Sequence, residues 1–385
     1  MKFKIAIALA ACLISQTAHA RDVILFIGDG MGVADITATR LYKNERRGGL
    51  FIDELPLIAH VRTGSHNKMV TDSAAAITAM ATGSKADNGC LGLGPRCDLN
   101  HRLVTIAEEA KKMGLSVGLV TTTRITHATP AGFYAHVADR NEEQKIAGQL
   151  LDSEIDVTMG GGCKYFSKDE VTRKGFTLAY NLRDIKMAPI DQKVVGCFAD
   201  SHIPFVLERK QSGYSGPSLP EMTKIAIERL SKNPKGFFLM VEGGRIDQAE
   251  HDNRAHDAFE ETIEFDAAVR AGASMTDPEK ALILVTADHE TGGLAINGYA
   301  KAGSSVLANA GEDADGRLYP IITWATGPHS AYPRVLDPND PASLEAAHTA
   351  VDVPLFAIGM KDHFKSGTIE NTDIHRLIST ALFER

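Results

Sequence analysis

The sequence predicts an α/β fold, a three-layer sandwich around a mainly parallel central sheet. Short apolar runs rich in β-branched residues recur along the chain, and segments with helical hydrophobic spacing lie between them. The apolar runs cover residues 23–27, 117–122, 237–241, 281–286 and 353–358. Alternating strands and helices are typical of a parallel sheet with helices on both faces. None of the runs contains a charged residue, so we expect both faces of each strand to be buried.

Helices are expected between these strands, above all at residues 104–113, 221–231 and 258–271. The chain has 385 residues, of which 44% are hydrophobic and 23% charged, and this composition supports a large globular core. The formal net charge of −8 argues against nucleic acid as a specific partner.

Residues 294–347 are rich in Gly, Ala, Asp and Pro and show few strand signals beyond residues 318–323. We interpret this segment as a surface insertion or small subdomain between two core strands. It contains the only tryptophan of the chain, Trp324. We expect this ring to lie in a local apolar core; an exposed ring that covers a site or meets a partner is the alternative.

The first 20 residues are predicted to be a signal peptide, followed by one domain over residues 21–385. Lys2 and Lys4 precede an apolar run at 5–14, and Ala-His-Ala at 18–20 fits a small-residue cleavage site. The run is too short to span a bilayer. The segment Leu-Ala-Ala-Cys, which ends at Cys12, also resembles a lipoprotein box, and its use would place a lipid on that cysteine. In either case we expect an exported protein, periplasmic or secreted.

Four cysteines lie beyond this segment: Cys90, Cys97, Cys163 and Cys197. In an exported protein they suggest two disulfides, with three possible pairings, of which Cys90–Cys97 and Cys163–Cys197 are the most local. A zinc site made of the four cysteines is the competing interpretation, but the chain lacks the closely spaced Cys-x-x-Cys pair of such sites.

Oxygen and imidazole side chains follow the ends of several predicted strands. They are, in chain order, Asp29, His127, Thr129, Glu242, Asp288 and His289. Because open α/β sheets bind ligands outside the carboxyl ends of their strands, we expect these side chains to meet at one edge of the sheet. One such acid could be a turn or cap residue, but this explanation is less plausible for all of them.

Asp247 and His251 are four residues apart, so on a helical turn they share one face. Histidine and carboxylate together suit catalytic zinc, and His348, which precedes the run at 353–358, is the candidate third ligand. The expected site contains carboxylates and imidazoles but no thiolate, which suits zinc and magnesium together. Clustered carboxylates would repel one another strongly without cations.

The stretch VTDSAAAITAM at 70–80 places Asp72 and Ser73 before a run of small, helix-favouring residues. Both residues can cap a helix by accepting hydrogen bonds from its first N–H groups. Alternatively, Ser73 is a nucleophile at a helix N-terminus, where the N–H groups and the dipole stabilise an anion. A serine hydroxyl requires a base or a metal ion for this role, and two metal ions can clamp both oxygens of an in-line displacement.

Together these residues resemble the alkaline phosphatase family. The matching stretches are GDGMG at 28–32, VTDSAAAITAMATG at 70–83, TTTRITHATPAGFYAH at 121–136, FFLMVEGGRIDQAEH at 237–251, VTADHETGG at 285–293 and HTAVDVPLFA at 348–357. They follow the family's order over nearly the whole mature chain, and the ordered set is far more specific than any one stretch. The stretches at 121 and 237 are most similar to the branch that includes animal enzymes.

The resemblance implies a role for each candidate residue. Ser73 would become phosphoserine, and Arg140, oriented by Asp72, would clamp the phosphate with its planar guanidinium. Two zinc ions and one magnesium ion are implied as cofactors. The implied ligands are Asp247, His251 and His348 for the zinc that activates water, Asp29, Asp288 and His289 for the zinc that activates Ser73, and Asp29, Thr129 and Glu242 for magnesium.

Two residues depart from part of the family. His127 and Gln248 stand where some bacterial members place an acid and a lysine near the third metal, although other members also carry histidine at the first position. Gln248 removes a positive charge near the phosphate and leaves the identity of the third metal open. The resemblance also implies a homodimer and a crown-like insertion at 294–347, here of modest length.

The function implied is hydrolysis of small-molecule phosphate monoesters to alcohol and inorganic phosphate. Phosphodiesterases and nucleotide pyrophosphatases of the same superfamily are the alternative, but they usually carry a threonine nucleophile. Sulfatases need a Cys/Ser-x-Pro-x-Arg setting that DSAAA at 72–76 lacks, and the signal peptide disfavours a cytoplasmic phosphoglycerate mutase. A metal-binding protein that had lost catalysis would lack Ser73 or a zinc ligand, and none of them is missing.

Overall fold

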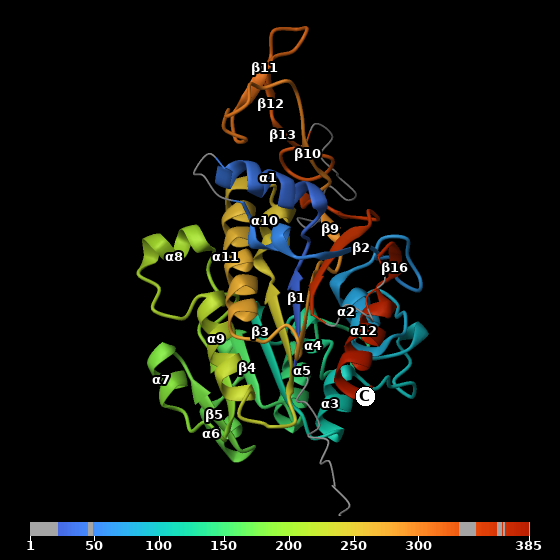
Figure 1. The fold of residues 1–385 in the computed structure, drawn as a ribbon, viewed down its shortest axis with the longest axis vertical. Helices are drawn as coiled ribbons and strands as arrows, with labels where there is room; N and C mark the ends of the chain where they lie inside the picture. The colour runs from blue at the N-terminus through green and yellow to red at the C-terminus, as the bar shows by residue number, and fades with distance from the viewer. Residues whose placement is uncertain (1–21, 45–48, 331–343, 360–363, 365, 385) are drawn as a thin grey trace, which may run out of the picture.

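The computed structural model describes residues 22–44, 49–330, 344–359, 364 and 366–384. Within these residues the centre of the molecule is a ten-stranded sheet, in the order β16-β2-β15-β8-β1-β7-β3-β4-β6-β5 (Figure 1). Its strands are β1 Asp22–Gly28, β2 Leu57–Arg62, β3 Ser116–Arg124, β4 Val157–Gly161, β5 Phe176–Ala179, β6 Lys193–Cys197, β7 Phe237–Gly243, β8 Ala281–Thr286, β15 Val353–Ile358 and β16 Thr368–Glu370. The predicted α/β sandwich with a mainly parallel sheet is confirmed.

One strand of this sheet runs against the others. β15 pairs antiparallel with both β8 and β2, whereas the remaining pairs in the sheet are parallel. All five predicted apolar runs lie in strands, namely β1, β3, β7, β8 and β15. In the central strands the side chains on both faces of the sheet are buried, as the absence of charged residues indicated.

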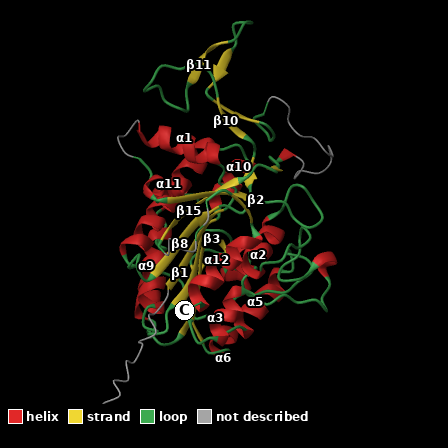
Figure 2. Cartoon of the chain, turned by 45° about the vertical axis from the view of Figure 1, so that its right-hand side comes forward, coloured by secondary structure: helices red, strands yellow, loops and turns green. Residues whose placement is uncertain are grey.

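Helices cover both faces of the sheet, and Figure 2 shows the two helical layers on either side of it. One layer contains α1 Val33–Asn44, α8 Val206–Ser212, α9 Leu219–Leu230 and α11 Ala255–Ser274. The other contains α2 Ser73–Thr82, α3 Ile106–Lys112, α4 Ala128–Ala131 and α12 Thr372–Phe383. The helices predicted at 104–113, 221–231 and 258–271 correspond to α3, α9 and α11.

The structure describes further helices, turns and strand pairs besides these. They are α5 Glu143–Asp152, α6 Lys168–Arg173, α7 Leu182–Met187, α10 Arg245–His251, the 3-10 turns Phe51–Glu54, Pro95–Cys97 and Cys163–Tyr165, and the strand pairs β9 Glu290–Thr291 with β14 His348–Thr349, β10 Leu294–Ile296 with β13 Ile322–Trp324, and β11 Asn309–Glu312 with β12 Leu318–Pro320.

The β10–β13 segment projects from the end of the molecule at which α1 and α10 lie (Figure 1). Trp324 is buried there in an apolar cluster with Leu294, Val306 and Ile321, which also includes Tyr42 of α1. The ring therefore belongs to a local core, as expected, and this core joins the insertion to the body. Residues 331–343 of the predicted insertion lie outside the described residues, as do the predicted signal peptide and Cys12.

The cysteines adopt the most local of the three pairings. Cys90 lies beside Cys97 and Cys163 beside Cys197, with Cα–Cα distances of 5.5 and 5.2 Å. A shared four-cysteine zinc site is therefore not formed. Among the described helices, each is too short or too polar to cross a bilayer.

The strand register sets the position of the acidic residues. Ile27 of β1 lies beside Glu242 of β7 and beside Thr286 of β8. Asp29 and Asp288 follow these paired residues by two positions, so the three acids emerge at the same carboxyl edge of the sheet. The fold thus brings together side chains that lie more than 200 residues apart in the sequence.

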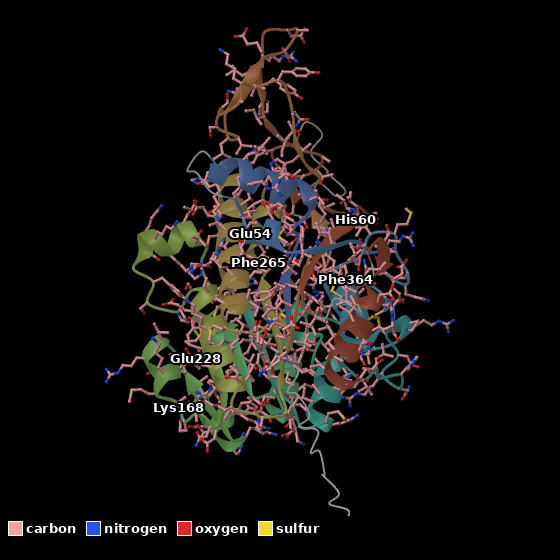
Figure 3. The ribbon with its side chains drawn as sticks, viewed as in Figure 1. Glu54, His60, Lys168, Glu228, Phe265 and Phe364 are labelled. Atoms are coloured by element: carbon pink, nitrogen blue, oxygen red, sulfur yellow. A yellow bond between two sulfur atoms is a disulfide. The ribbon has the colours of Figure 1, made fainter. Side chains whose placement is uncertain are left out.

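We expect Phe265→Ala to lower the free energy of unfolding by about 3–5 kcal/mol, because it opens a cavity in the core. Phe265 of α11, labelled in Figure 3, is fully buried. Its ring meets Phe26 of β1 edge to face, with centroids 6.2 Å apart. Leu318→Ala is the control, because Leu318 is 67% exposed and should change stability by less than about 0.5 kcal/mol. Urea unfolding midpoints measure both, and equal losses would contradict the packing described here.

Candidate functional site

Three overlapping clusters of carboxylate and imidazole groups lie at the carboxyl edge of the sheet. The first cluster is Asp247, His251 and His348; the second is Asp29, Asp288 and His289; the third is Asp29, Thr129 and Glu242, with His127 beside it. Asp29, Glu242 and Asp288 are fully buried, and Asp247 is 5% exposed. The structure thus brings together the residues that the sequence predicted as metal ligands.

The first cluster joins α10 to β14. Nε2 of His251 lies 3.3 Å from Oδ1 of Asp247 and 3.2 Å from Nε2 of His348. Each imidazole donates its Nδ1–H to a backbone carbonyl, His251 to Ala346 at 2.6 Å and His348 to Thr71 at 2.9 Å. Because a carbonyl only accepts, each ring, when neutral, presents an Nε2 lone pair toward Asp247. Two lone pairs and a carboxylate oxygen in this arrangement fit a cation.

Without a cation, a proton takes its place in the first cluster. Burial lowers the pKa of His251, but the facing Asp247 carboxylate outweighs burial and raises that pKa to about 9. Burial also opposes ionisation of Asp247, yet the attraction of His251 holds the pKa of Asp247 well below its usual range. A metal ion that binds here must therefore displace the proton of His251.

The second cluster surrounds Nε2 of His289. This nitrogen lies 3.2 Å from Oδ2 of Asp288, 3.5 Å from Oδ1 of Asp29 and 3.2 Å from Oγ of Ser73. Asp247 reaches the same place, because ligand atoms of Asp29, Asp247 and His289 all lie within 4.8 Å of one another. Asp247 therefore lies between the first and second clusters.

Two oxygens of the second cluster lack a donor. Oδ1 of Asp288 accepts hydrogen bonds from the N–H groups of Gly30 and His289, at 3.2 and 3.0 Å. No donor among the described residues reaches Oδ2 of Asp288 or Oδ1 of Asp29. Burial, followed by the neighbouring carboxylates, raises the pKa of Asp288 to about 7 and that of Asp29 well above its usual range. These unsatisfied oxygens point to a missing positive charge.

The third cluster forms between β1, β7 and α4. Oγ1 of Thr129 lies 3.5 Å from Oδ2 of Asp29. Thr121 and Thr123 donate to Oε2 of Glu242, whereas Oε1 of Glu242 has no donor within the described part of the chain. Ligand atoms of Asp29, His127 and Glu242 lie within 4.8 Å of one another. His127 therefore joins the residues expected at the third metal.

Asp72 and Ser73 have separate roles at the start of α2. Asp72 is the N-cap: its Oδ1 accepts the N–H of Ala75 at 2.9 Å, and its Oδ2 accepts the N–H of Gly89 at 3.0 Å. Ser73 is the first helical residue and is 2% exposed, with Oγ directed at His289. The helix cap is therefore Asp72. The Ser73 hydroxyl is not used as a cap and is available for a role in the site.

Arg140 extends between the helix cap and the third cluster. Its guanidinium donates to Oδ2 of Asp72 at 3.1 Å, and its other terminal nitrogen lies 3.3 Å from Nε2 of His127. About one fifth of the side chain is exposed (21%). Asp72 thus orients Arg140 toward the clusters, in the geometry that the sequence led us to expect.

The sequence did not identify His202, which follows β6. Its ring meets that of His127 edge to face, with centroids 5.5 Å apart, and Arg124 donates to its Nε2. Gln248 also contacts His202, with its Nε2 at 3.1 Å from Nε2 of the ring, and its Oε1 accepts from Arg245. Burial, aided by the positive charge of Arg124, lowers the pKa of His202 to about 3. The only signal in the sequence is a histidine shortly after a strand.

Thr291 was also missed, although it lies two residues after His289. Its hydroxyl contacts both Asp247 and His289, at 2.6 and 3.2 Å. A buried threonine is common in strands, so the residue type alone gave no reason to single it out.

A cavity of about 820 Å³ lies away from these clusters, against α3 and α5. It is lined by residues such as Arg102, Lys111, Phe133 and His136 and includes none of the cluster residues. The orphaned oxygens and converging ligand atoms nevertheless favour the carboxyl edge as the functional site.

The chain is similar to known proteins over most of its length. A sequence model of the alkaline phosphatase family matches residues 20–383. The chain is 34% identical to the membrane-bound alkaline phosphatase of Bombyx mori, over 93% of this chain and 80% of the relative. It is 35% identical to the tissue-nonspecific isozyme of alkaline phosphatase from Homo sapiens, over 81% of this chain and 71% of that protein.

Solved structures show the same fold. Alkaline phosphatase from Thermus thermophilus superposes with a TM-score of 0.80 at 25% identity, over 98% of this chain and 96% of that chain. A cold-active alkaline phosphatase from Shewanella sp. superposes with a TM-score of 0.75 at 29% identity, over 94% of this chain and 99% of that chain.

Removal of divalent cations should lower the melting temperature, because the buried carboxylates then repel one another. Zinc and magnesium at about 100 times their dissociation constants should each restore about 2.7 kcal/mol per site. Calorimetry of chelator-treated protein, before and after each ion is added back, measures the effect. Asp29→Asn should reduce the response to both ions, because Asp29 belongs to two clusters. A melting temperature that stays unchanged after chelation and after the ions are added back would contradict the cation sites.

Proposed function

Because the chain belongs to the alkaline phosphatase family, it is a phosphatase that acts on phosphate monoesters, and we propose that it works through a phosphoserine intermediate on Ser73. The observation that carries this proposal is the position of the Ser73 hydroxyl. It stands at the N-terminus of α2, 3.2 Å from Nε2 of His289, beside three clusters of buried ligand groups. A helix N-terminus and cations together favour an anion at this place.

The proposed cofactors are two zinc ions and one magnesium ion. The first cluster would hold one zinc, the second cluster the other, and the third cluster magnesium. When bound, the zinc ions would supply Lewis-acid charge that favours ionisation of the Ser73 hydroxyl and of water. The oxygen and imidazole ligands support these ions. In the alkaline phosphatase from the Antarctic bacterium TAB5, variants in which Asp or Glu replaces a histidine are described with Mg bound in the M3 site.

The protein's own groups would orient the ester and receive the phosphoryl group. Arg140, fixed by Asp72, would hold two phosphate oxygens through its planar guanidinium. The ionised Ser73 oxygen would then attack phosphorus while the bond from phosphorus to the alcohol oxygen breaks, and the alcohol leaves with a proton. Water would attack the phosphoserine next, which releases inorganic phosphate and restores the Ser73 hydroxyl.

The phosphodiesterase alternative receives no support from the relatives. Those named above are alkaline phosphatases in both the sequence and the structure comparisons. The third cluster, with Thr129 and Glu242 beside Asp29, favours the three-metal phosphatase in this chain.

We also propose that the protein is exported to the periplasm or secreted and acts as a homodimer. The two cysteine pairs are compatible with an oxidising compartment. The signal peptide predicted at 1–20 supports export from the sequence.

Nitrophenyl phosphate monoester and the matching diester test the substrate class. With zinc and magnesium present at mildly alkaline pH, we expect kcat/KM for the monoester to exceed that for the diester by several orders of magnitude. The activity should disappear with a chelator and return with zinc. A preference for the diester would instead favour the phosphodiesterase alternative.

Ser73→Ala should lower turnover by several orders of magnitude, because the variant has no oxygen to form the phosphoserine. Its zinc and magnesium content should match that of the wild type, because Ser73 is not needed as a metal ligand. Ser231→Ala, at the exposed end of α9, is the matched control and should keep full activity. Undiminished turnover by Ser73→Ala would refute the nucleophile assignment.

A further inference from the structure

A single buried hydroxyl connects the first and second clusters. Thr291 lies in β9 and is fully buried. Its Oγ1 is 2.6 Å from Oδ1 of Asp247 and 3.2 Å from Nδ1 of His289. Asp247 belongs to the first cluster and His289 to the second, so this oxygen contacts one proposed ligand of each zinc ion.

The direction of the two hydrogen bonds follows from the groups involved. A threonine hydroxyl carries one proton and two lone pairs, and an ionised carboxylate only accepts. The shorter contact, at 2.6 Å, therefore takes the hydroxyl proton to Asp247. The remaining contact requires His289 to donate, so its proton resides on Nδ1. The Nε2 lone pair of His289 then faces Asp29, Asp288 and Ser73.

The backbone holds Thr291 in this position from two sides. Its N–H donates to the carbonyl of Gly30 at 3.1 Å, in the turn that follows Asp29. In the strand pair β9–β14 its register partner is His348, the third residue of the first cluster. The backbone of Thr291 is therefore held against residues of both clusters.

We propose that Thr291 is a positioning residue that sets the tautomer of His289 and the orientation of Asp247 through one hydroxyl, and so couples the two zinc sites. This inference rests on the proposed function. Without the hydroxyl, Asp247 loses a donor and the Nδ1–H of His289 loses its acceptor. The His289 ring can then place its proton on Nε2, where it blocks the lone pair that faces the second cluster. Both sites are affected by one substitution.

Thr291→Val and Thr291→Ser test the proposal as a matched pair. Valine keeps the branched shape but lacks the hydroxyl, whereas serine keeps the hydroxyl. Zinc affinity, measured by competition with a chelator, should fall about 10- to 100-fold for both zinc ions in Thr291→Val. In Thr291→Ser it should stay within about threefold of the wild type. Wild-type zinc affinity in a folded Thr291→Val would overturn the proposal.

Nitrogen-15 spectra of histidine-labelled wild-type protein give a second measurement that does not depend on the Thr291 variants. We expect the His289 signals, assigned by their loss in His289→Gln, to show a proton on Nδ1. A proton on Nε2 in the zinc-loaded protein would overturn the proposal. Wild-type protein that binds zinc but lacks monoesterase activity would count against the proposed function alone, because these readouts do not measure turnover.

Discussion

The burial of negative charge at one edge of the sheet constrains the whole molecule. Asp29, Glu242 and Asp288 are fully buried and Asp247 nearly so. A ligand atom of Asp29 lies within 4.8 Å of Asp247 in one group and of Glu242 in another. Buried carboxylates cost several kcal/mol each unless they are paired or hydrogen-bonded. In this chain backbone N–H groups and threonine hydroxyls satisfy some of their oxygens, and others keep no donor within the described residues. The fold therefore provides a site whose charge balance is completed by cations.

The scaffold positions this charge with two kinds of element. The parallel strands β1, β7 and β8 end in register, which fixes three acids on a rigid edge. The imidazoles of the first cluster come from α10 and the two-residue strand β14. Backbone carbonyls of Ala346 and Thr71 hold the two rings in place. These carbonyls select the tautomer of each ring. Backbone groups far apart in the sequence thus prepare the ligands before any ion arrives.

Much of the fold and of the site was accessible from the sequence, because burial and spacing carry that information. Uncharged apolar runs located the strands, and polar residues directly after them located the functional edge. The spacing of Asp247 and His251 showed a shared helix face. The pattern could not show that β15 runs antiparallel, because an apolar run reports burial but not direction. Nor could it show His202, whose contacts with His127 and Gln248 are purely tertiary.

The same limit applies to Asp247, which the sequence assigned to one cluster. Its carboxylate also reaches the ligand atoms of Asp29 and His289, and it accepts the hydroxyl of Thr291. Sequence spacing gives pairs of residues on one element, whereas shared ligands depend on how three elements meet. A sequence prediction that assigns one residue to one ion is therefore easily changed by the structure.

Gln248 is uncharged, whereas some bacterial members of the family carry a lysine near the third metal. Arg245 donates to the Gln248 amide oxygen, and this amide in turn contacts the neutral ring of His202. Arg124 is paired with Glu143 at 2.7 Å, and Arg140 with Asp72 at 3.1 Å. Arg124 and Arg140 thus each have a carboxylate partner in the free protein. Under the proposed function, Arg140 would therefore mainly orient the phosphate, and much of the charge that holds the phosphate dianion would come from the proposed cations.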